Sequence, residues 1–282
     1  MKRFLIFIFL YLLTSGTLLS QNISLMSYNI RYDNPRDSIN NWQNRKDFLL
    51  SQLNYYKPEI IGTQEGLEHQ ITWLNDKLES YNYVGIGRGD NKEKGVGEFS
   101  AIFYNSEKFT KIESKTFWLS QTPDQPSRGW DASLNRICTY ILLEEKVTNN
   151  KFWVFNTHFD HKGKIAREKS SKLILQFMDS LNLDNYPMIL MGDFNLTPNT
   201  SPIKSIGKQL NDSRSVTQNL PFGPEGTYCG FDVCKIVKHR IDYIFTSKEN
   251  ILVKDYAVMS DVIDLKYPSD HLPVLINIKL KE

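Results

Sequence analysis

The chain has 282 residues and a formal net charge of +2, from 34 lysines and arginines against 32 aspartates and glutamates. Both surplus charges are Lys2 and Arg3, because residues 1–20 contain no acidic side chain and the rest of the chain is balanced. Charged residues at 23% and hydrophobic residues at 40% exclude a disordered chain, collagen, a coiled coil and a polytopic membrane protein. A chain of this length can bury a full core as one large domain or two modest ones.

The N-terminal segment, residues 1–20, has the pattern of a secretory signal peptide. Lys2 and Arg3 precede a short apolar stretch, Phe4–Leu13, and small or polar residues follow it. The apolar stretch is about half of the ~20 residues needed to span a bilayer, so an uncleaved membrane anchor is the weaker alternative. We therefore expect a mature chain of residues 21–282, periplasmic or secreted after export, with no transmembrane segment.

Apolar runs and their spacing predict the secondary structure. Runs rich in β-branched and aromatic residues predict strands at Ile23–Ile30, Ile60–Thr63, Tyr83–Ile86, Phe99–Tyr104, Lys111–Leu119, Ile137–Leu143, Phe152–Thr157, Met188–Met191, Ile241–Phe245, Leu252–Met259 and Val274–Ile278. Apolar residues three or four positions apart predict helices over Trp42–Tyr55, Leu67–Leu78 and Ile165–Leu181, with a short helix that begins near Thr200.

The order of these elements indicates the fold class. Four of the predicted strands, between Phe99 and Thr157, follow one another without a helix. A (β/α)₈ barrel would alternate strand and helix along the whole chain. Consecutive strands followed by helices instead favour antiparallel strands in two stacked sheets with helices outside. We therefore expect one α+β domain over residues 21–282.

Polar residues that can bind a metal ion or a phosphate stand at the ends of several predicted strands. They occur in six segments: Ser27–Asn29, Gly62–Glu65, Asn156–His161, Gly192–Asn195, His239–Ile244 and Ser269–His271. Because the strands of stacked sheets deliver their ends to a common rim, we expect these segments to converge. Taken singly each has a structural explanation: Asn29 and Asp193 could be turn residues, and Asp242 could pair with Arg240 in the interior. The six together favour a functional site.

The donor types in these segments indicate a hard metal ion. Carboxylates dominate: Glu65, Asp193, Asp242 and Asp270. Oxygen ligands with few soft donors favour Mg²⁺, with Mn²⁺ as the alternative, and such an ion polarises a phosphate oxygen as a Lewis acid. His158 and His271 are suited to act as a phosphate donor and a general base.

Other classes of site are less well supported. A binuclear zinc hydrolase would use His158, Asp160 and His161, but that class needs more histidines than the five in this chain. The glycines of Gly85–Gly89 lack the spacing of a dinucleotide-binding motif. The sequence contains neither the G-x-S-x-G motif of serine hydrolases nor a phosphate-binding P-loop.

Several segments resemble the motifs of a known family. The runs Gly192–Asn195, Arg240–Phe245 and Ser269–Val274, spaced as here, resemble those of the endonuclease/exonuclease/phosphatase superfamily, the deoxyribonuclease I-like proteins. The run Asn156–Gly163, together with Gly129–Arg136, resembles a secreted bacterial branch that is more distantly similar to deadenylases. The resemblance covers essentially the whole mature chain. It implies a four-layer α/β/β/α sandwich, in which two stacked mixed β-sheets are flanked by helices.

The resemblance also implies a metal site. Glu65 would bind the divalent ion directly, Asn29 would help to hold it, and Asp270 stands where a further carboxylate of the site is expected. The implied cofactor is Mg²⁺, again with Mn²⁺ as the alternative.

Five further residues would carry out catalysis in an enzyme of this kind. His271 would be the general base for the attacking water, and Asp242 would orient its imidazole. Asp193 and Asn195 would position the water and the phosphate, and His158 would stabilise the charge on the phosphoryl oxygens. Whether the Asp193 or the His271 position takes the proton stays open at this point.

Candidate substrate contacts flank this set, and they are Arg136, Asp160, His161, Trp130 and Arg240. Trp130 could stack on a base or a sugar, although a buried structural tryptophan is equally consistent with the sequence. Asp160 and His161 could instead form a local hydrogen-bonded turn.

The substrate class is the least determined feature. Members of the superfamily cleave nucleic acids, sphingomyelin or inositol phosphates, and a nuclease would benefit from a basic surface. The mature chain has no basic excess, only local clusters within Lys162–Lys172 and Lys235–Arg240, and no apolar hairpin suited to a membrane. We expect a secreted, metal-dependent phosphoester hydrolase, most simply a monomeric phosphodiesterase or nuclease. The alternatives are a phosphatase or phosphodiesterase for phosphorylated sugars, inositol or lipid headgroups, and a catalytically silent binding domain.

The three cysteines are expected to be structural. Cys138 lies in an apolar run and is most simply a buried thiol. Cys229 and Cys234 are close enough in sequence to form a small-loop disulfide in an oxidising compartment, or to remain as two thiols.

Overall fold

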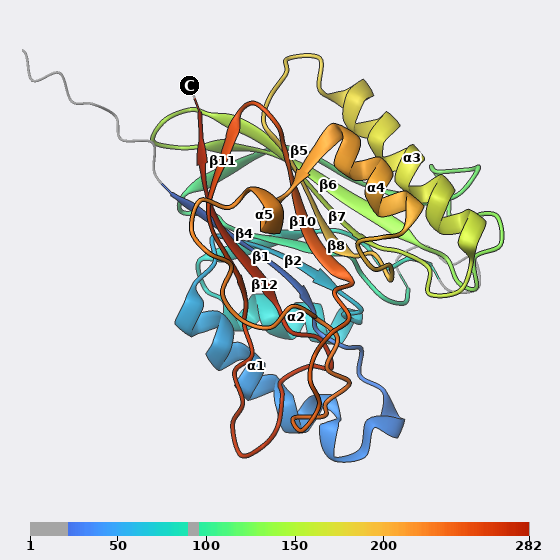
Figure 1. The fold of residues 1–282 in the computed structure, drawn as a ribbon, viewed down its shortest axis with the longest axis vertical. Helices are drawn as coiled ribbons and strands as arrows, with labels where there is room; N and C mark the ends of the chain where they lie inside the picture. The colour runs from blue at the N-terminus through green and yellow to red at the C-terminus, as the bar shows by residue number, and fades with distance from the viewer. Residues whose placement is uncertain (1–21, 90–95, 282) are drawn as a thin grey trace, which may run out of the picture.

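The computed structural model describes residues 22–89 and 96–281. The predicted signal peptide therefore lies outside the described residues. The described chain forms two six-stranded β-sheets that stack face to face, with helices on both outer sides (Figure 1). The predicted four-layer α/β/β/α sandwich with two mixed sheets is confirmed.

The first sheet has the strand order β11-β12-β1-β2-β4-β3. Its strands are β1 (Ile23–Asn29), β2 (Ile60–Gln64), β3 (Tyr81–Val84), β4 (Ile102–Asn105), β11 (Ile251–Val258) and β12 (Val274–Leu280). The neighbours β1 and β2 are parallel, and Asn29 pairs in register with Gln64. Because parallel strands end at the same edge, Asn29 and Glu65 emerge side by side.

The second sheet has the strand order β5-β6-β7-β8-β10-β9. Its strands are β5 (Phe109–Trp118), β6 (Ile137–Glu145), β7 (Lys151–His158), β8 (Met188–Asp193), β9 (Leu210–Asp212) and β10 (Asp242–Ser247). The parallel neighbours β7 and β8 end at the register pair His158 and Asp193, and the antiparallel β10 begins opposite Asp193 at Asp242. Three polar residues of the predicted site thus meet at one edge. Only β9 was missed, because three residues are too few to show a period.

Helices cover the outer face of each sheet. The first sheet is covered by α1 (Trp42–Tyr56), which the 3₁₀ helix η1 (Pro35–Asn40) precedes, and by α2 (Glu68–Lys77). The second sheet is covered by α3 (Lys164–Leu181) and α4 (Ser201–Gln209). A single helical turn, α5 (Ser213–Val216), follows β9. The start and end of α1 follow from local chemistry. The Asn41 side chain accepts a hydrogen bond from the Asn44 amide, and Lys57 ends the helix in a left-handed conformation just before Pro58. Within residues 22–89 and 96–281, no helix has the length and apolar character needed to cross a bilayer.

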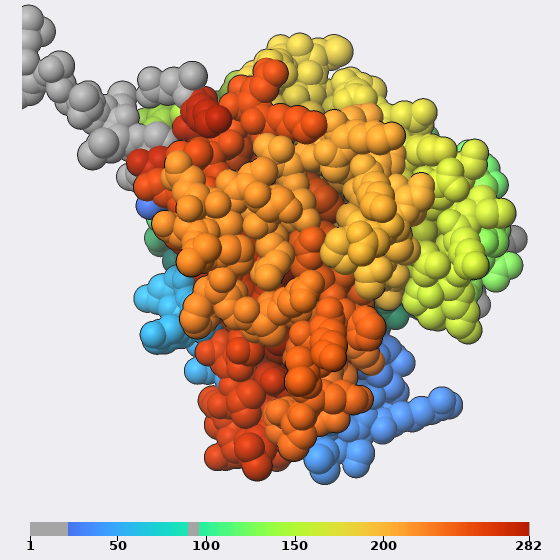
Figure 2. Space-filling model, in the orientation of Figure 1, coloured from blue at the N-terminus to red at the C-terminus, as the bar shows by residue number. Residues whose placement is uncertain are grey.

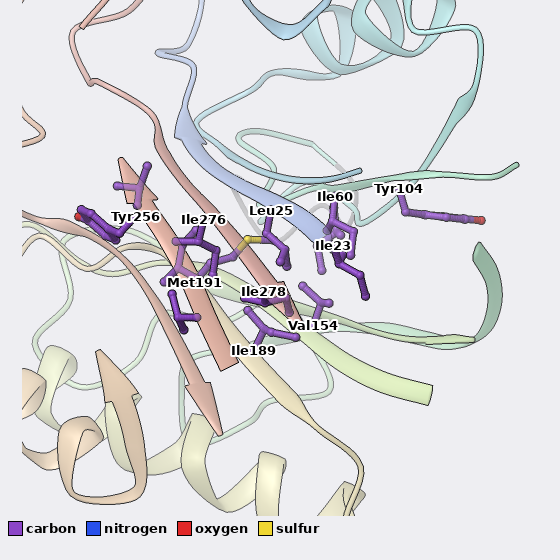
Figure 3. Close-up of a cluster of buried hydrophobic side chains, with 14 of the residues drawn as sticks. Ile23, Leu25, Ile60, Tyr104, Val154, Ile189, Met191, Tyr256, Ile276 and Ile278 are labelled. Atoms are coloured by element: carbon purple, nitrogen blue, oxygen red, sulfur yellow. The ribbon is translucent and has the colours of Figure 1, made fainter. Parts of the chain in front are cut away.

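The largest apolar cluster fills the space between the two sheets (Figure 3). Leu25, Ile60 and Ile276 of the first sheet face Ile189 and Met191 of the second, and all are fully buried. Burying such side chains contributes roughly 1.5–3 kcal/mol each. The packing holds the two sheets in one fixed relation, so it also fixes the spacing of the polar residues at their ends.

The last third of the chain builds one side of this edge. Figure 2 shows it, in orange to red, over much of the face turned toward the viewer. Its connection from α5 to β10 hydrogen-bonds the segment before β12, through Cys229 N–H to Asp270 O at 2.9 Å and Leu272 N–H to Thr227 O at 2.7 Å. Cys229 is buried and Cys234 is exposed, and both are free thiols in this structure. Tyr228 is carried into the cleft by this connection.

Candidate active site

A cleft of about 770 Å³ opens where β1, β2, β7, β8 and β10 meet. Its walls include eight of the residues that the sequence predicts for the site: Glu65, Arg136, His158, His161, Asp193, Asn195, Asp270 and His271. Asn29 and Asp242 lie behind these residues, fully or almost fully buried. The sandwich therefore brings together residues that are up to 242 positions apart, counted from Asn29 to His271.

His271 and Asp242 form a buried pair at the floor of the cleft. The Nδ1 atom of His271 lies 2.9 Å from Oδ2 of Asp242, and its Nε2 atom lies 3.8 Å from Oδ2 of Asp193. Burial by itself lowers the pKa of His271, but the charges of Asp242 and Asp193 outweigh it and raise the pKa well above the usual value. The imidazole is thus oriented and made strongly basic.

Asp193 stands at the centre of the site. Its Oδ1 atom accepts a hydrogen bond from the Asn195 amide at 2.8 Å, and its Oδ2 atom accepts one from Asn29 Nδ2 at 3.0 Å. The Nε2 atom of His158 is 3.5 Å from the same Oδ2. Burial, followed by the charge of the nearby Asp242, raises the pKa of Asp193 to about 7. Asp193 therefore forms a turn through its hydrogen bond to the Asn195 amide, and it also lies beside two histidines, His158 and His271.

His158 and Asn195 form a polar pair on one wall. The amide nitrogen of Asn195 lies 3.1 Å from Nε2 of His158 and donates to the carbonyl of Phe159 at 3.0 Å. Asn195 adopts a left-handed backbone conformation with φ of 50°, which turns its side chain toward the histidine. Burial, then the positive charges of Arg136 and Arg88, hold the pKa of His158 well below its usual value. His158 is therefore neutral at physiological pH.

Glu65 is presented to the cleft by a constrained backbone. Its φ is 66°, and its Oε2 atom accepts the Tyr32 amide hydrogen at 3.2 Å. Its Oε1 atom accepts from Asn29 Nδ2 at 3.1 Å, while the Oδ1 atom of Asn29 is taken by the Arg31 amide at 3.0 Å. Asn29 thus turns a nitrogen, which cannot bind a cation, toward Glu65 and Asp193. In this structure Asn29 therefore hydrogen-bonds these two carboxylates, and its predicted part in holding the metal stays a prediction.

The carboxylates around this point fit a divalent cation. One ligand atom from each of Glu65, His158 and Asp193 lies within 4.8 Å of the others. Asp270 is nearby, and burial, opposed by His271 and reinforced by the charge of Glu65, raises its pKa. Buried carboxylates whose charges repel one another are stabilised by a cation. The oxygen-rich set suits a hard ion such as Mg²⁺ or Mn²⁺.

Of the predicted substrate contacts, Arg136 and His161 line the cleft. Nη2 of Arg136 lies 3.1 Å from Nδ1 of His161. Asp160 lies beneath them, where its oxygens accept the amide hydrogens of Ser133, Lys162 and Gly163 while Oδ2 pairs with Arg136 at 3.5 Å. Asp160 therefore shapes the turn and holds Arg136, and it is not among the residues that line the cleft.

The two remaining predicted contacts do not line the cleft. Arg240 is held by two hydrogen bonds to Asp212, at 2.9 and 2.6 Å, and its guanidinium stacks on the ring of Tyr243. It is buried against the second sheet, and it is not the partner of Asp242. Trp130 is half-buried in the loop after β5, also outside the cleft walls.

Several cleft residues were missed by the sequence reasoning: Arg31, Tyr32, Asp33, Leu67, Arg88, Glu98, Leu134, Tyr228 and Ile241. Arg31 follows the end of β1 by two positions, so the rule that found Asn29 could have found it. Arg88 lies in the glycine-rich run Gly85–Gly89, which lacks the spacing of a dinucleotide-binding motif, and it pairs with Glu98 at 2.7 Å. Tyr228 carried no signal; only the fold places its ring 5.1 Å from that of His271.

Solved structures of known proteins share this architecture over nearly the whole chain. A mannosyl-6-phosphatase of Bacteroides thetaiotaomicron is 38% identical, with a TM-score of 0.86 and coverage of 91% of this chain and 99% of that one. An endonuclease/exonuclease/phosphatase family protein of the same species is 36% identical, with a TM-score of 0.88 and coverage of 93% and 99%.

A more distant relative is a nuclease. The 3′-5′-exoribonuclease subunit of the CCR4-Not complex of Mycosarcoma maydis is 22% identical, over 93% of this chain and 51% of its own length. The chain thus spans about half of that protein. The sequence pattern of the Endonuclease/Exonuclease/phosphatase family matches residues 26–271, from the middle of β1 to the cleft histidine. The predicted superfamily is confirmed, and the secreted bacterial branch within it stays a prediction. The chain belongs to the Endonuclease/Exonuclease/phosphatase family.

Proposed function

We propose that the protein is an exported, monomeric, Mg²⁺-dependent phosphatase that acts on phosphorylated sugars. Members of its family are phosphoester hydrolases, and the proposal names the substrate class on which this protein acts. Two features of the cleft support this choice: its size and the local concentration of positive charge in its walls. The cleft has room for one small ligand of the size that such pockets usually bind. Three arginines, Arg31, Arg88 and Arg136, stand in its walls, while the mature chain has no basic excess.

The relative with a named small substrate supports the same class. A mannosyl-6-phosphatase that is 38% identical covers nearly all of this chain. The sequence by itself ranked a phosphodiesterase or nuclease first and a sugar phosphatase second. The small cleft and this relative together support the sugar phosphatase as the first candidate.

Enzymes of this family use divalent metals, and here Glu65 and Asp193 would hold the ion, with Asp270 beside them. Such an ion, Mg²⁺ or alternatively Mn²⁺, would neutralise charge on the phosphoryl oxygens and polarise the phosphorus–oxygen bond. Asn29 keeps both ligands in place through its amide nitrogen.

The attacking water would be activated between Asp193 and His271. Asp242 binds the Nδ1 proton of His271, so the Nε2 atom faces the cleft and Asp193. Nε2 and Oδ2 of Asp193 are 3.8 Å apart, which lets both contact one water molecule between them. This pair titrates as a unit, and a cation held beside it would favour its deprotonated form. It would take the proton of the water that attacks phosphorus and pass it to the sugar oxygen as the bond between that oxygen and phosphorus breaks. His158 and Asn195 position the phosphoryl oxygens as neutral polar groups.

An exonuclease is the second candidate function. It is supported by the CCR4-Not relative and by Lys162, Lys164 and Arg167, which follow the His158 strand at the start of α3. These side chains would contact the backbone of a polynucleotide that extends out of the cleft. A catalytically silent binding domain is the least supported candidate, because the paired acids, bases and cation ligands are all present.

A hydrolysis screen tests the proposal. Mature protein in Mg²⁺ buffer is assayed for phosphate release from mannose 6-phosphate, glucose 6-phosphate, a generic phosphodiester, a phospholipid and single-stranded RNA, with EDTA and His271→Ala as controls. We expect sugar phosphates to be cleaved fastest, and EDTA and His271→Ala to abolish the activity. Faster shortening of RNA, with a steep dependence on salt, would favour the exonuclease. Cleavage of none of these substrates would leave the binding domain.

The predicted export is proposed on the basis of the N-terminal pattern alone. Expression of the full chain in a bacterial host with a matched variant, Lys2→Glu with Arg3→Glu, tests it. We expect the unaltered chain in the periplasm or medium, with residues 1–20 removed, and the variant retained as an uncleaved precursor.

A further inference from the structure

We propose that Arg31 is a specificity-determining residue that selects phosphate monoesters over phosphodiesters. The inference rests on the proposed phosphoester hydrolysis and states which ester the same site takes. A monoester is mostly a dianion at neutral pH, because its second pKa is about 6, and it has three non-bridging oxygens. A diester has one charge and two such oxygens. A fixed positive donor therefore interacts more strongly with the monoester.

The backbone holds Arg31 in an unusual conformation beside the cation ligands. Its φ is 54°, in the left-handed region. Its amide donates to Oδ1 of Asn29 at 3.0 Å, and its carbonyl accepts from Nε2 of Gln70 at 3.0 Å. The chain is thus fixed on both sides of Arg31, which directs the side chain along the cleft wall.

The guanidinium group is held on two of its three nitrogens. Nε and Nη2 bind the two oxygens of Asp37 at 2.8 and 3.0 Å, a two-pronged arrangement that resists rotation. The group also lies 4.7 Å above the ring of Tyr32. Asp37 itself is held by Nδ2 of Asn34 at 2.9 Å. The charge is therefore placed before any substrate arrives, so little conformational entropy is lost on binding.

The third nitrogen, Nη1, faces the reaction centre. It lies 3.7 Å from Oε2 of Glu65 and 3.7 Å from Oδ2 of Asp270, close enough to feel both charges and too far for a hydrogen bond. Across residues 22–89 and 96–281, no acceptor comes within hydrogen-bond distance of Nη1. Two charged N–H bonds are thus available to a ligand at the place where Glu65 would hold the cation.

A phosphoryl group at this centre has room to meet Nη1. Ligand atoms of Glu65, His158 and Asp193 lie within 4.8 Å of one another, and Nη1 lies 3.7 Å from Glu65. Arg31, His158 and Asn195 line the same cleft, so a phosphoryl group beside Glu65 can meet His158 and Asn195 with one oxygen and Nη1 with another. In a diester, one of these oxygens would carry a carbon substituent and no charge.

The test compares two matched variants on two matched substrates. Arg31→Gln removes the charge, and Arg36→Gln makes the same change at an exposed arginine of η1 that does not line the cleft. The substrates are 4-nitrophenyl phosphate and bis(4-nitrophenyl) phosphate, which release the same chromophore. We expect Arg31→Gln to lower kcat/KM for the monoester by about 10- to 100-fold, the range of a hydrogen bond between charged groups, and for the diester by less than threefold. Arg36→Gln keeps the wild-type ratio.

An equal loss on both esters would overturn the inference, because it would mean that Arg31 only holds Glu65 and Asp270 in place. A second measurement separates this inference from the proposed function. Binding of inorganic phosphate to the Mg²⁺-loaded protein is followed by calorimetry, with Mn²⁺ binding as a check that the cation site is intact. If the wild type cleaves neither ester, the proposed function fails, yet an at least tenfold weaker phosphate affinity in Arg31→Gln alone still supports the role of Arg31. Unchanged phosphate affinity, or no phosphate binding by the wild type, overturns it.

Discussion

His271 and Asp242 are joined by a buried contact of 2.9 Å between Nδ1 and Oδ2. Asp242 opens β10 of the second sheet, and His271 stands just before β12 of the first. The pair therefore links the two sheets at the edge where the cleft opens. Because the carboxylate holds Nδ1, the other ring nitrogen is left to face the cleft, which is the arrangement that a general base requires.

Replacing Asp242 with asparagine is expected to lower kcat by about 10²- to 10⁴-fold, the usual contribution of an oriented acid–base group. The amide neither holds the imidazole in the same tautomer nor raises its basicity. KM should change little, because Asp242 is buried behind His271 and does not line the cleft. Steady-state kinetics on the best substrate measure both constants. Asp255→Asn, on β11 outside the cleft, is the control, and a loss in Asp242→Asn no larger than in this control would contradict the assigned role.

Asp193 is expected to make the metal-free protein less stable as pH rises. Its pKa is about 7 in the folded protein against an ordinary value near 3.9 in the unfolded chain. Between these values the unfolded chain releases the proton and the folded protein keeps it. The free energy of unfolding therefore falls from about pH 4 to about pH 7, and this cost is complete above pH 7. Asp193→Asn avoids this cost, so its stability relative to the wild type should be higher at pH 8 than at pH 5, while it abolishes hydrolysis.

The measurement is the difference in Tm between Asp193→Asn and the wild type, in EDTA, at pH 5 and pH 8. The gap should be wider at pH 8. A gap that is constant with pH, or wider at pH 5, would show that the carboxyl group is not the proton-binding group described here.

A divalent cation is expected to stabilise the folded protein. An ion that binds only the native state adds about 2.7 kcal/mol at a concentration 100 times its Kd, and here it would also relieve the repulsion among Glu65, Asp193 and Asp270. Titration of Mg²⁺ or Mn²⁺ into the EDTA-treated protein should therefore raise Tm. Glu65→Gln should remove most of that increase, whereas Glu68→Gln, nearby on α2 and outside the cleft, should keep it. Equal increases in both variants would argue against Glu65 as a ligand.

The close contact between the two sheets is expected to make any larger side chain at Gly62 destabilising. A Cβ atom there would lie 2.6 Å from Cε of Met191 and 2.9 Å from Cγ of Asn156, across the sheet interface. Gly62→Ala should destabilise the fold by about 1–3 kcal/mol through overpacking. Gly207→Ala in α4 meets nothing within 4 Å and should stabilise it by about 0.5–1 kcal/mol. Urea unfolding measures both, and similar free energies for the two variants would refute the packing argument.

The spacing of apolar residues predicts most of the secondary structure. The strands and the four longer helices lie close to the predicted ranges, because each element must show its buried face in its own sequence. The same logic located Glu65, His158, Asp193 and His271, since Glu65 directly follows an apolar strand, His158 and Asp193 end one, and His271 lies just before one. Arg240 and Trp130, predicted as substrate contacts, lie outside the cleft walls, because nothing local to them shows which neighbour the fold provides.

The mature chain has no basic excess, and its positive charge matters for function where Arg31, Arg88 and Arg136 line the cleft. The sequence by itself determined that the chain is neutral apart from its first three residues, that it folds as stacked sheets, and that its polar residues gather at strand ends. Which atoms meet there was decided by the tertiary structure. Arg240 binds Asp212 and leaves Asp242 to His271, Asn29 turns its nitrogen to two carboxylates, and Nη1 of Arg31 lies 3.7 Å from Glu65. Such partnerships join segments far apart in the chain. They depend on how two sheets pack, and no local pattern of residues encodes that distance.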